Sequence, residues 1–122
     1  MINWSPAWKA SKKPGKQRKF LHKAPLHVKS KMMSATLSKE LRKTVKSRSL
    51  RVRKGDKVKV MRGQFGGKSG TVERVDVGNQ HVFVTGVEFM KRDGSKSLYP
   101  VHPSKLMITD VDKSDKRRVS KQ

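Results

Sequence analysis

The chain has 122 residues, of which 31 are Lys or Arg and 9 are Asp or Glu, so its formal net charge is +22. Because so large a charge repels itself in the free protein, the composition predicts a polyanionic partner. The absence of cysteine excludes a disulfide framework and fits a reducing, cytoplasmic setting. No apolar run approaches the roughly 18 residues that span a membrane, and no stretch resembles a signal peptide. We therefore expect a soluble nucleic-acid binder.

The positive charge is concentrated toward the N-terminus. Residues 1–54 hold 17 Lys and Arg and one acid, Glu40, a net charge of +16. Residues 55–110 hold 9 bases and 6 acids, a net charge of +3, so we predict a boundary near Arg53. We expect a basic extended segment (1–23), short helices and a linker (24–52), a β domain (53–110) and a polar tail (111–122).

The first segment, residues 1–23, interleaves cations with aromatic rings and has little periodicity. It cannot bury enough apolar surface to offset its ordering entropy, so we expect it to be disordered alone and to order against RNA. Its cations would bind phosphates, and Trp4 or Trp8 could stack on bases. The alternative is a solvated tail whose Trp side chains pack on the domain. The cations assigned to RNA are Lys9, Lys12, Lys13, Lys16, Arg18, Lys19 and Lys23.

Residues 24–45 are predicted to form two short helices. Pro25 suits a first helical turn, and Ser38 suits an N-cap with Glu40 in the turn behind it. The pair Met32-Met33 is interpreted as a docking contact rather than as part of a ligand-binding site.

A second basic run leads into the β domain. Arg51 and Arg53 alternate with Leu50 and Val52, as residues at a strand edge do. We favour phosphate binding over a merely solvated face for this run. It comprises Lys46, Arg48, Arg51, Arg53 and Lys54.

The clearest strand pattern begins after Gly55-Asp56, which supply a turn. Residues 57–61 alternate Lys with apolar side chains, which is the period of a half-buried strand with Val58 and Val60 facing a core. A glycine-punctuated loop over residues 62–67 follows this strand.

A second strand is predicted over residues 68–77. Its apolar side chains change parity between Val72 and Val75, so an extra residue must enter the strand. We therefore expect a bulge or sharp bend near Glu73-Arg74, a feature that small barrels use to turn a corner.

Further short strands are predicted between two tight turns and beyond them. Val87 and Phe89 should face the core, as should Leu106 and Ile108 near the end. Pro residues confine the segment 95–101 to a sheet edge or a strand end. Five or so short strands over about 56 residues indicate a small SH3-like barrel. The remaining predicted segments are 80–85, 87–92, 95–101 and 105–109, with turns at Gly78-Asn79 and Asp93-Gly94.

Catalytic and metal chemistries find little support. Gly63 to Ser69 superficially resembles a phosphate-binding P-loop, but it has three residues where that loop needs four, and strand-like sequence follows it. The four histidines lack metal-ligand spacing, and nothing pairs Ser, His and Asp, so we predict no enzyme, no cofactor and no metal site. His102 could contact RNA, although we favour a locally satisfied loop histidine.

Several of these positions together resemble the KOW motif, which occurs in ribosomal proteins and in transcription elongation factors. They are Gly55-Asp56, Val58, Val60, Arg62-Gly63, Gly67-Lys68, Gly70 and Val72. The flanks are APLHVKSKMMSATLSKELRK at residues 24–43, RSLRVRKGD at 48–56 and VHPSKLMIT at 101–109. Together they resemble the archaeal and eukaryotic branch of the large-subunit ribosomal protein family numbered twenty-four in the universal scheme. The resemblance covers nearly the whole chain and looks more archaeal than eukaryotic.

The resemblance implies a mainly β protein, in which a small SH3-like KOW barrel carries a basic N-terminal extension. It implies a structural constituent of the large ribosomal subunit, with rRNA and neighbouring ribosomal proteins as partners and no small-molecule substrate. The rRNA contact would be to the 5′ domain, made early in assembly near the nascent-chain exit. By position, Arg62, Gln64 and Lys68 would lie against rRNA, although Gly66 stands where the family often has a cation.

Two other function classes remain open. A KOW module could regulate transcription elongation on RNA polymerase, but such factors usually place another folded domain before the barrel. Residues 1–54 are too basic and too aperiodic to form one. The other class is a free RNA chaperone with no fixed site, which the composition alone does not exclude.

Overall fold

The computed structural model of the chain describes residues 3–120. The sequence predicts a mainly β fold, but helices and strands are both well represented, so the fold is mixed. The strands are β1 (Ser34–Leu37), β2 (Ser49–Arg51), β3 (Lys57–Val60), β4 (Ser69–Asp76), β5 (His81–Met90), β6 (Lys96–Val101) and β7 (Leu106–Asp110). The helices are α1 (Pro14–Lys23), α2 (Leu26–Lys31), α3 (Lys39–Val45) and α4 (Lys116–Ser120), with 3₁₀ turns η1 (Pro6–Ala10) and η2 (Pro103–Lys105).

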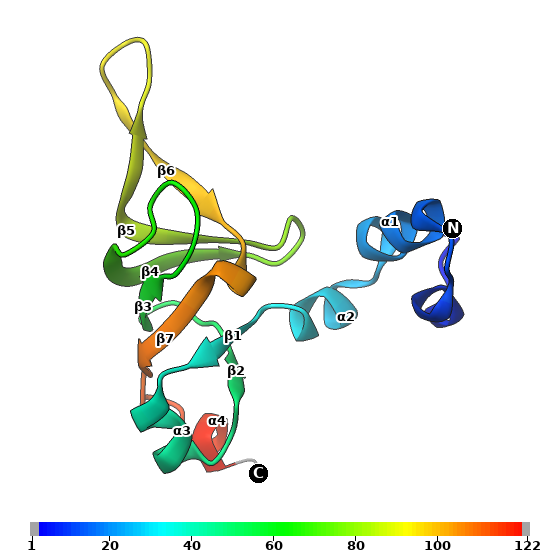
Figure 1. The fold of residues 1–122 in the computed structure, drawn as a ribbon, viewed down its shortest axis with the longest axis horizontal. Helices are drawn as coiled ribbons and strands as arrows, with labels where there is room; N and C mark the ends of the chain where they lie inside the picture. Colours follow the sequence, from blue (N-terminus) through cyan, green and yellow to red (C-terminus); the bar gives the residue numbers. More distant parts are fainter. Residues whose placement is uncertain (1–2, 121–122) are drawn as a thin grey trace.

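The seven strands form one curled sheet in the order β2-β1-β7-β3-β4-β5-β6, a half-barrel with β2 and β6 at its edges (Figure 1). Paired strands are antiparallel except β1 and β7, which run parallel. Five of the strands lie within residues 55–110, the region in which the sequence predicts short strands. Pro100 cannot donate to a strand ladder, and it lies in the edge strand β6 as expected.

The parity change in β4 is a bulge, as predicted. Val72 pairs with Val84 whereas Arg74 pairs with Phe83, so Glu73 is the extra residue. A bulge bends its strand and increases the local twist. It lies where β4, which pairs with β3 through its first residues, continues along β5.

Gly70 of β4 lies close to the backbone of β5. A Cβ atom built there would stand 2.3 Å from the carbonyl oxygen of Thr85 and 2.8 Å from Cγ1 of Val84. A backbone oxygen cannot move aside as a flexible side chain can, so this position of the strand requires glycine.

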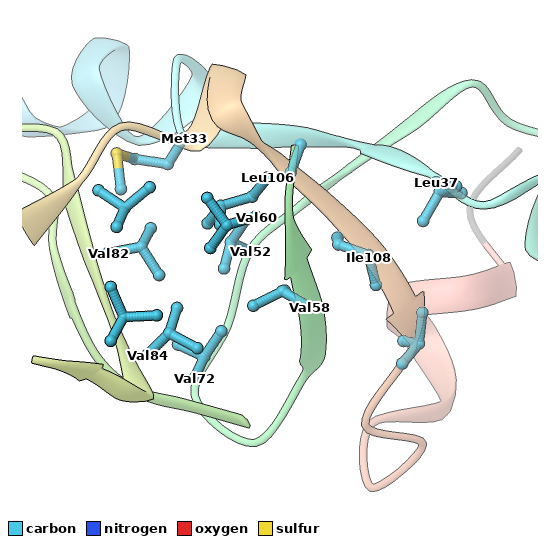
Figure 2. Close-up of a cluster of buried hydrophobic side chains, with 14 of the residues drawn as sticks. Met33, Leu37, Val52, Val58, Val60, Val72, Val82, Val84, Leu106 and Ile108 are labelled. Carbon is cyan, nitrogen blue, oxygen red and sulfur yellow. The ribbon is translucent and has the colours of Figure 1, made fainter. Parts of the chain in front are cut away.

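Aliphatic side chains fill the inner face of the sheet (Figure 2). Val58 and Val60 of β3 are buried, as the alternation predicts, and so are Leu106 and Ile108 of β7. Because β3 and β7 are neighbours in the sheet, these four side chains form a continuous apolar surface at its centre.

The segment over residues 24–45 contains a strand that the sequence analysis missed. The two predicted helices are confirmed as α2 and α3, and the Ser38 side chain caps α3 as expected. Between them, however, lies β1, which directs Ala35 and Leu37 inward, and Met33 just before it is buried too, each of the three being 1% exposed. The weak helical spacing of the apolar residues concealed this period of two.

Most of residues 3–23 is helical, whereas the sequence predicts an extended segment; residues 1–2 lie outside the described part. Pro14 occupies the first turn of α1, where its fixed φ favours helix initiation. Phe20 of α1 is buried, and its ring packs against Trp4 with 5.3 Å between centroids. This aromatic pair joins the residues before η1 to α1.

Phe89 is exposed, whereas the alternation in β5 predicts that it faces the core. Val87 lies two residues earlier on the same face and is fully buried, but Phe89 is 42% exposed. The pairing of β5 with β6 shifts register between Phe83 and Glu88, and Gly86 has a φ of +83° there. Past that shift the two strands project from the sheet as a hairpin (Figure 1), so this face no longer covers a core.

The sequence predicts a polar tail after β7, but part of this segment folds onto the sheet. Val111 is buried, and α4 carries Arg118, which is 8% exposed. The Arg118 guanidinium contacts Asp56, whose side chain is completely buried. Residues 121–122 of the expected tail lie outside the described part of the chain.

Candidate nucleic-acid interface

All sixteen side chains that the sequence assigns to RNA are exposed. They fall into three groups, which we call the arm, the basic run and the loop group. The arm is residues 3–23, with Lys9, Lys12, Lys13, Lys16, Arg18, Lys19 and Lys23. The basic run is residues 46–54, with Lys46, Arg48, Arg51, Arg53 and Lys54. The loop group is Arg62, Gln64, Lys68 and His102.

Few of the cations in residues 3–120 have an acidic partner. Three Lys or Arg side chains in this range lie within 4.0 Å of a carboxylate, and two of these pairs are exposed. The other cations lack such a partner within the described residues, so a polyanion would supply their counter-charge. The three pairs are Arg53 with Asp115 (2.9 Å), Lys57 with Asp110 (3.9 Å) and Arg118 with Asp56.

The arm is organised by its polar and aromatic contacts. Trp4 Nε1 donates a hydrogen bond to the carbonyl oxygen of Phe20 (3.1 Å). Gln17 Nε2 donates to the carbonyl oxygens of Lys9 (2.9 Å) and Ser11 (2.7 Å). The Trp4 side chain therefore packs within the arm itself. The sequence analysis offered two alternatives, stacking on an RNA base and packing on the β domain, and this arrangement favours neither of them.

The arm extends away from the sheet (Figure 1). Its helix α1 carries no acidic residue in its first turn, and an isolated helix of ten residues is marginal in water. Cations crowded on so short a helix repel one another, so phosphates bound along it would stabilise it.

One cleft lies between the arm and the β4–β5 turn. Arg18 and His22 share this cleft of about 270 Å³ with Lys29 and the turn at residues 78–80.

The basic run separates two clefts. Arg51 and Arg53 line both of them, one of about 340 Å³ and the other of about 670 Å³. The smaller cleft also contains Arg117 of α4, which the sequence analysis did not assign to RNA, and the larger contains Lys54 and Arg74. Four arginines line the smaller cleft, because the buried Arg118 also borders it, and their charge suits a phosphate group.

A buried carboxylate fixes the backbone of the basic run. Asp56 accepts hydrogen bonds from the Arg53 N–H (2.9 Å), the Asp112 N–H (3.1 Å) and Arg118 Nη1 (2.6 Å). Arg118 Nη2 donates to Asp56 as well and to the Arg51 carbonyl oxygen (2.7 Å). The pair joins α4 to the turn before β3, and so it orients Arg51 and Arg53.

Asp115 modulates the charge at the smaller cleft. Hydrogen bonds from the Arg53 side chain and the Arg117 N–H lower the pKa of its exposed carboxyl group. The carboxylate is therefore ionised at neutral pH and partly neutralises Arg53. A phosphate entering the cleft would compete with Asp115 for that guanidinium.

The loop over residues 62–67 is held close to β3 by backbone hydrogen bonds. Gly67 N–H donates to the Val60 carbonyl oxygen (2.7 Å), and Val60 N–H donates to the Lys68 carbonyl oxygen (2.8 Å). Phe65 anchors the loop in the core, and Lys68 Nζ lies 5.0 Å from the centroid of its ring. Lys68 is thus held over the loop, with its charge exposed.

Two members of the loop group also have local structural roles. Arg62 Nη2 donates to the Ser104 carbonyl oxygen (2.8 Å). His102 Nδ1 accepts from the Ser104 N–H (3.2 Å) and thereby caps η2. Partial desolvation of the imidazole, followed by the nearby charges of His81 and Lys105, lowers the pKa of His102, which favours the neutral imidazole that this cap requires. The locally satisfied histidine is therefore the interpretation that the geometry favours.

Other chemistries have no visible basis in the described part of the chain. Residues 3–120 contain no cluster of three or more His, Asp or Glu side chains that could hold a metal ion. None of the helices in the same range is long and apolar enough to cross a membrane. The surface offers basic clefts and loops, which are suited to binding rather than to reaction chemistry.

A protein-family profile matches residues 11–121 of the chain. It describes the ribosomal proteins L26 of eukaryotes and L24p of archaea. The match includes α1, the whole sheet and α4, and therefore all three groups of predicted RNA contacts apart from Lys9.

Proposed function

The chain belongs to this family of eukaryotic and archaeal ribosomal proteins, and from that premise we propose that it binds the 5′ domain of large-subunit rRNA early in assembly. Family membership makes it a non-enzymatic constituent of the large ribosomal subunit. The family also implies the SH3-like KOW fold, with which the curled half-barrel agrees. The rRNA domain, the early binding, a position near the nascent-chain exit and a cytoplasmic location belong to the proposal.

The observation that carries this proposal is the distribution of cations without acidic partners. Basic side chains line the arm, both clefts beside the basic run, and the loop over residues 62–67. A phosphate backbone following these three groups would neutralise them and release its own counterions. Binding should therefore weaken steeply with salt, with a log–log slope of about −0.7 to −0.9 for each phosphate contact.

The proposed mechanism is structural. The arm neutralises phosphates that would otherwise repel one another as rRNA helices pack, and the sheet presents a rigid face of defined shape. Side chains cannot read the deep, narrow major groove of A-form RNA, so recognition of paired regions should depend on RNA shape. The preorganised backbone around Asp56 and the 62–67 loop supplies that rigidity.

Sedimentation of a cell lysate through a sucrose gradient after a high-salt wash tests the proposal. The protein should co-sediment with large subunits, because a protein built into folded rRNA is also held by shape and packing contacts, which salt does not screen. Footprinting of naked rRNA with the purified protein should then protect the 5′ domain. Recovery with RNA polymerase would instead support an elongation regulator, and release at moderate salt would support a loosely bound chaperone.

A further inference from the structure

Two aromatic rings are exposed at the base of the β5–β6 hairpin, beside the 62–67 loop. Phe89 is 42% exposed and Tyr99 is 37% exposed. Phe89 pairs with Ser97 across the hairpin, and Tyr99 lies two residues beyond Ser97, so both rings are on the same face. Exposed aromatic rings side by side on a sheet form a surface that apolar planar groups can cover.

The rings are held in place from the core outward. Tyr99 packs on the buried Phe65 ring with 4.9 Å between centroids. Phe89 meets Tyr99 edge to face at 6.2 Å. This chain of contacts orients the two exposed rings before any ligand arrives, so little side-chain entropy would be lost on binding.

Cations lie beside Tyr99 and its packing partner Phe65. Lys68 Nζ lies over the Phe65 ring at 5.0 Å, and Tyr99 shares a small pocket with Arg62, Gln64 and Lys105. The nearest acid in sequence is Glu88, which alternation in β5 places on the opposite face from Phe89. An aromatic surface bordered by cations suits a ligand with planar rings and negative charges, which are the parts of a nucleotide.

We propose that Phe89 and Tyr99 form a stacking platform for unpaired RNA bases, while Lys68 and Lys105 bind the adjoining phosphates. This inference rests on the proposed function and adds a contact of a different kind. Bases inside a duplex offer no free face, so the platform selects a single-stranded loop or bulge. Trp4, which the sequence analysis considered for stacking, is already engaged with Phe20.

The test measures the affinity of the full-length protein for a transcript of its large-subunit rRNA and, separately, for heparin. The variants Phe89→Leu and Tyr99→Leu keep apolar bulk but remove the ring. Each should bind rRNA about fivefold to a hundredfold more weakly, the usual effect of losing one base stack. Heparin is a polyanion without bases, so its affinity should not change. The slope of log affinity against log salt should not change either, because no cation is removed.

Two matched variants serve as controls. Tyr99→Phe keeps the ring and should bind rRNA as the wild type does. Phe83→Leu makes the same substitution on β5, but Arg74 already lies over that ring, 4.2 Å from its centroid. It should therefore leave rRNA affinity unchanged. If Tyr99→Leu loosens the packing on Phe65, as thermal unfolding would reveal, then Phe89→Leu decides the outcome.

The outcomes separate the platform from the proposed function. If the wild type binds rRNA tightly and both Leu variants bind equally well, the platform is wrong and the proposed function stands. An equal loss of rRNA and heparin affinity would also contradict stacking. Normal binding to naked rRNA with poor incorporation into subunits would assign the rings to a protein partner and reject the platform. If the wild type does not discriminate rRNA from heparin, both proposals fail.

Discussion

The arm and the sheet distribute charge and apolar burial in opposite ways. In α1, Phe20 is the one buried side chain, and the predicted RNA cations of the arm are all exposed. The sheet holds a continuous aliphatic core, and residues 55–110 have a net charge of only +3. We therefore propose that the arm contributes RNA affinity at little benefit to stability, whereas the sheet contributes stability and shape. Mutations in the two regions should therefore affect different measurements.

The largest expected effect is on affinity, from the arm. Replacing Lys12, Lys13, Lys16, Arg18 and Lys19 with Ala should weaken rRNA binding by about a thousandfold at 0.15 M salt, with a salt slope shallower by about 4. The sheet should unfold at the same denaturant concentration as the wild type. The control variant keeps the charge, with Arg for each Lys and Lys for Arg18, and should bind nearly normally. Unchanged affinity of the Ala variant would exclude the arm as an RNA contact.

In the buried ion pair, by contrast with the arm, a cation is needed for the stability of the fold. Arg118→Met should lower the free energy of unfolding by about 3 kcal/mol or more, because it leaves the Asp56 carboxylate buried without its partner. Arg117→Met changes the neighbouring, exposed arginine and should alter stability by no more than about 0.5 kcal/mol. Urea denaturation measures both variants. Equal stability of the two would show that Arg118 is not a structural residue.

The same substitution, Gly to Ala, can be made in the sheet and in the arm, and it should have different effects in the two regions. Gly70→Ala should destabilise the sheet by about 3 kcal/mol, because the new methyl group would meet the backbone oxygen of Thr85. Gly15→Ala in α1 meets nothing within 4 Å and should raise helicity slightly without changing the stability of the sheet. Denaturation followed by circular dichroism distinguishes them. A stable, folded Gly70→Ala variant would contradict the close approach of β4 and β5.

The smallest expected effect concerns pH. Folding lowers the pKa of His102, so its contribution to stability is present above the pKa of the unfolded chain and is lost as the pH falls through the folded value. Stability should therefore decline slightly from pH 7.5 to pH 5. His102→Asn preserves an N-cap acceptor without titrating and should reduce that decline. An identical pH profile in the variant would show that the cap does not depend on the neutral imidazole.

The sequence patterns predicted local features of the sheet well. The alternation around Val58 and Val60 identified a strand and its buried face, and the parity change near Glu73 identified a bulge. Both features depend on neighbouring residues in one strand, and the period of two is visible over a few positions. Exposure of the predicted cations was also predictable, because unpaired Lys and Arg side chains remain in water.

Features that depend on distant partners were not predictable in the same way. β1 is a strand because it pairs with β2 and with β7, and the residues of β7 lie about 70 positions later in the sequence. Arg118 is buried because it meets Asp56, which the sequence suggested only as a turn residue. Phe89 is exposed because the hairpin leaves the core after a register shift. The available signal was Asp56 itself, an acid that follows a run of basic residues, but the sequence analysis did not interpret it as half of a buried pair.

The Asp56–Arg118 contact also has a consequence for the order of events during synthesis. Arg118 follows Asp56 by 62 residues, so a ribosome adding about 5–20 residues per second makes it several seconds later. During that interval Asp56 lacks its partner, and α4 is not yet present to hold the strand of the basic run. Nascent chains interrupted before Arg118 should therefore carry Arg51 and Arg53 without the ion pair that orients them. We therefore expect the proposed RNA-binding cleft to be completed only late in translation, after most of the positive charge has already been made.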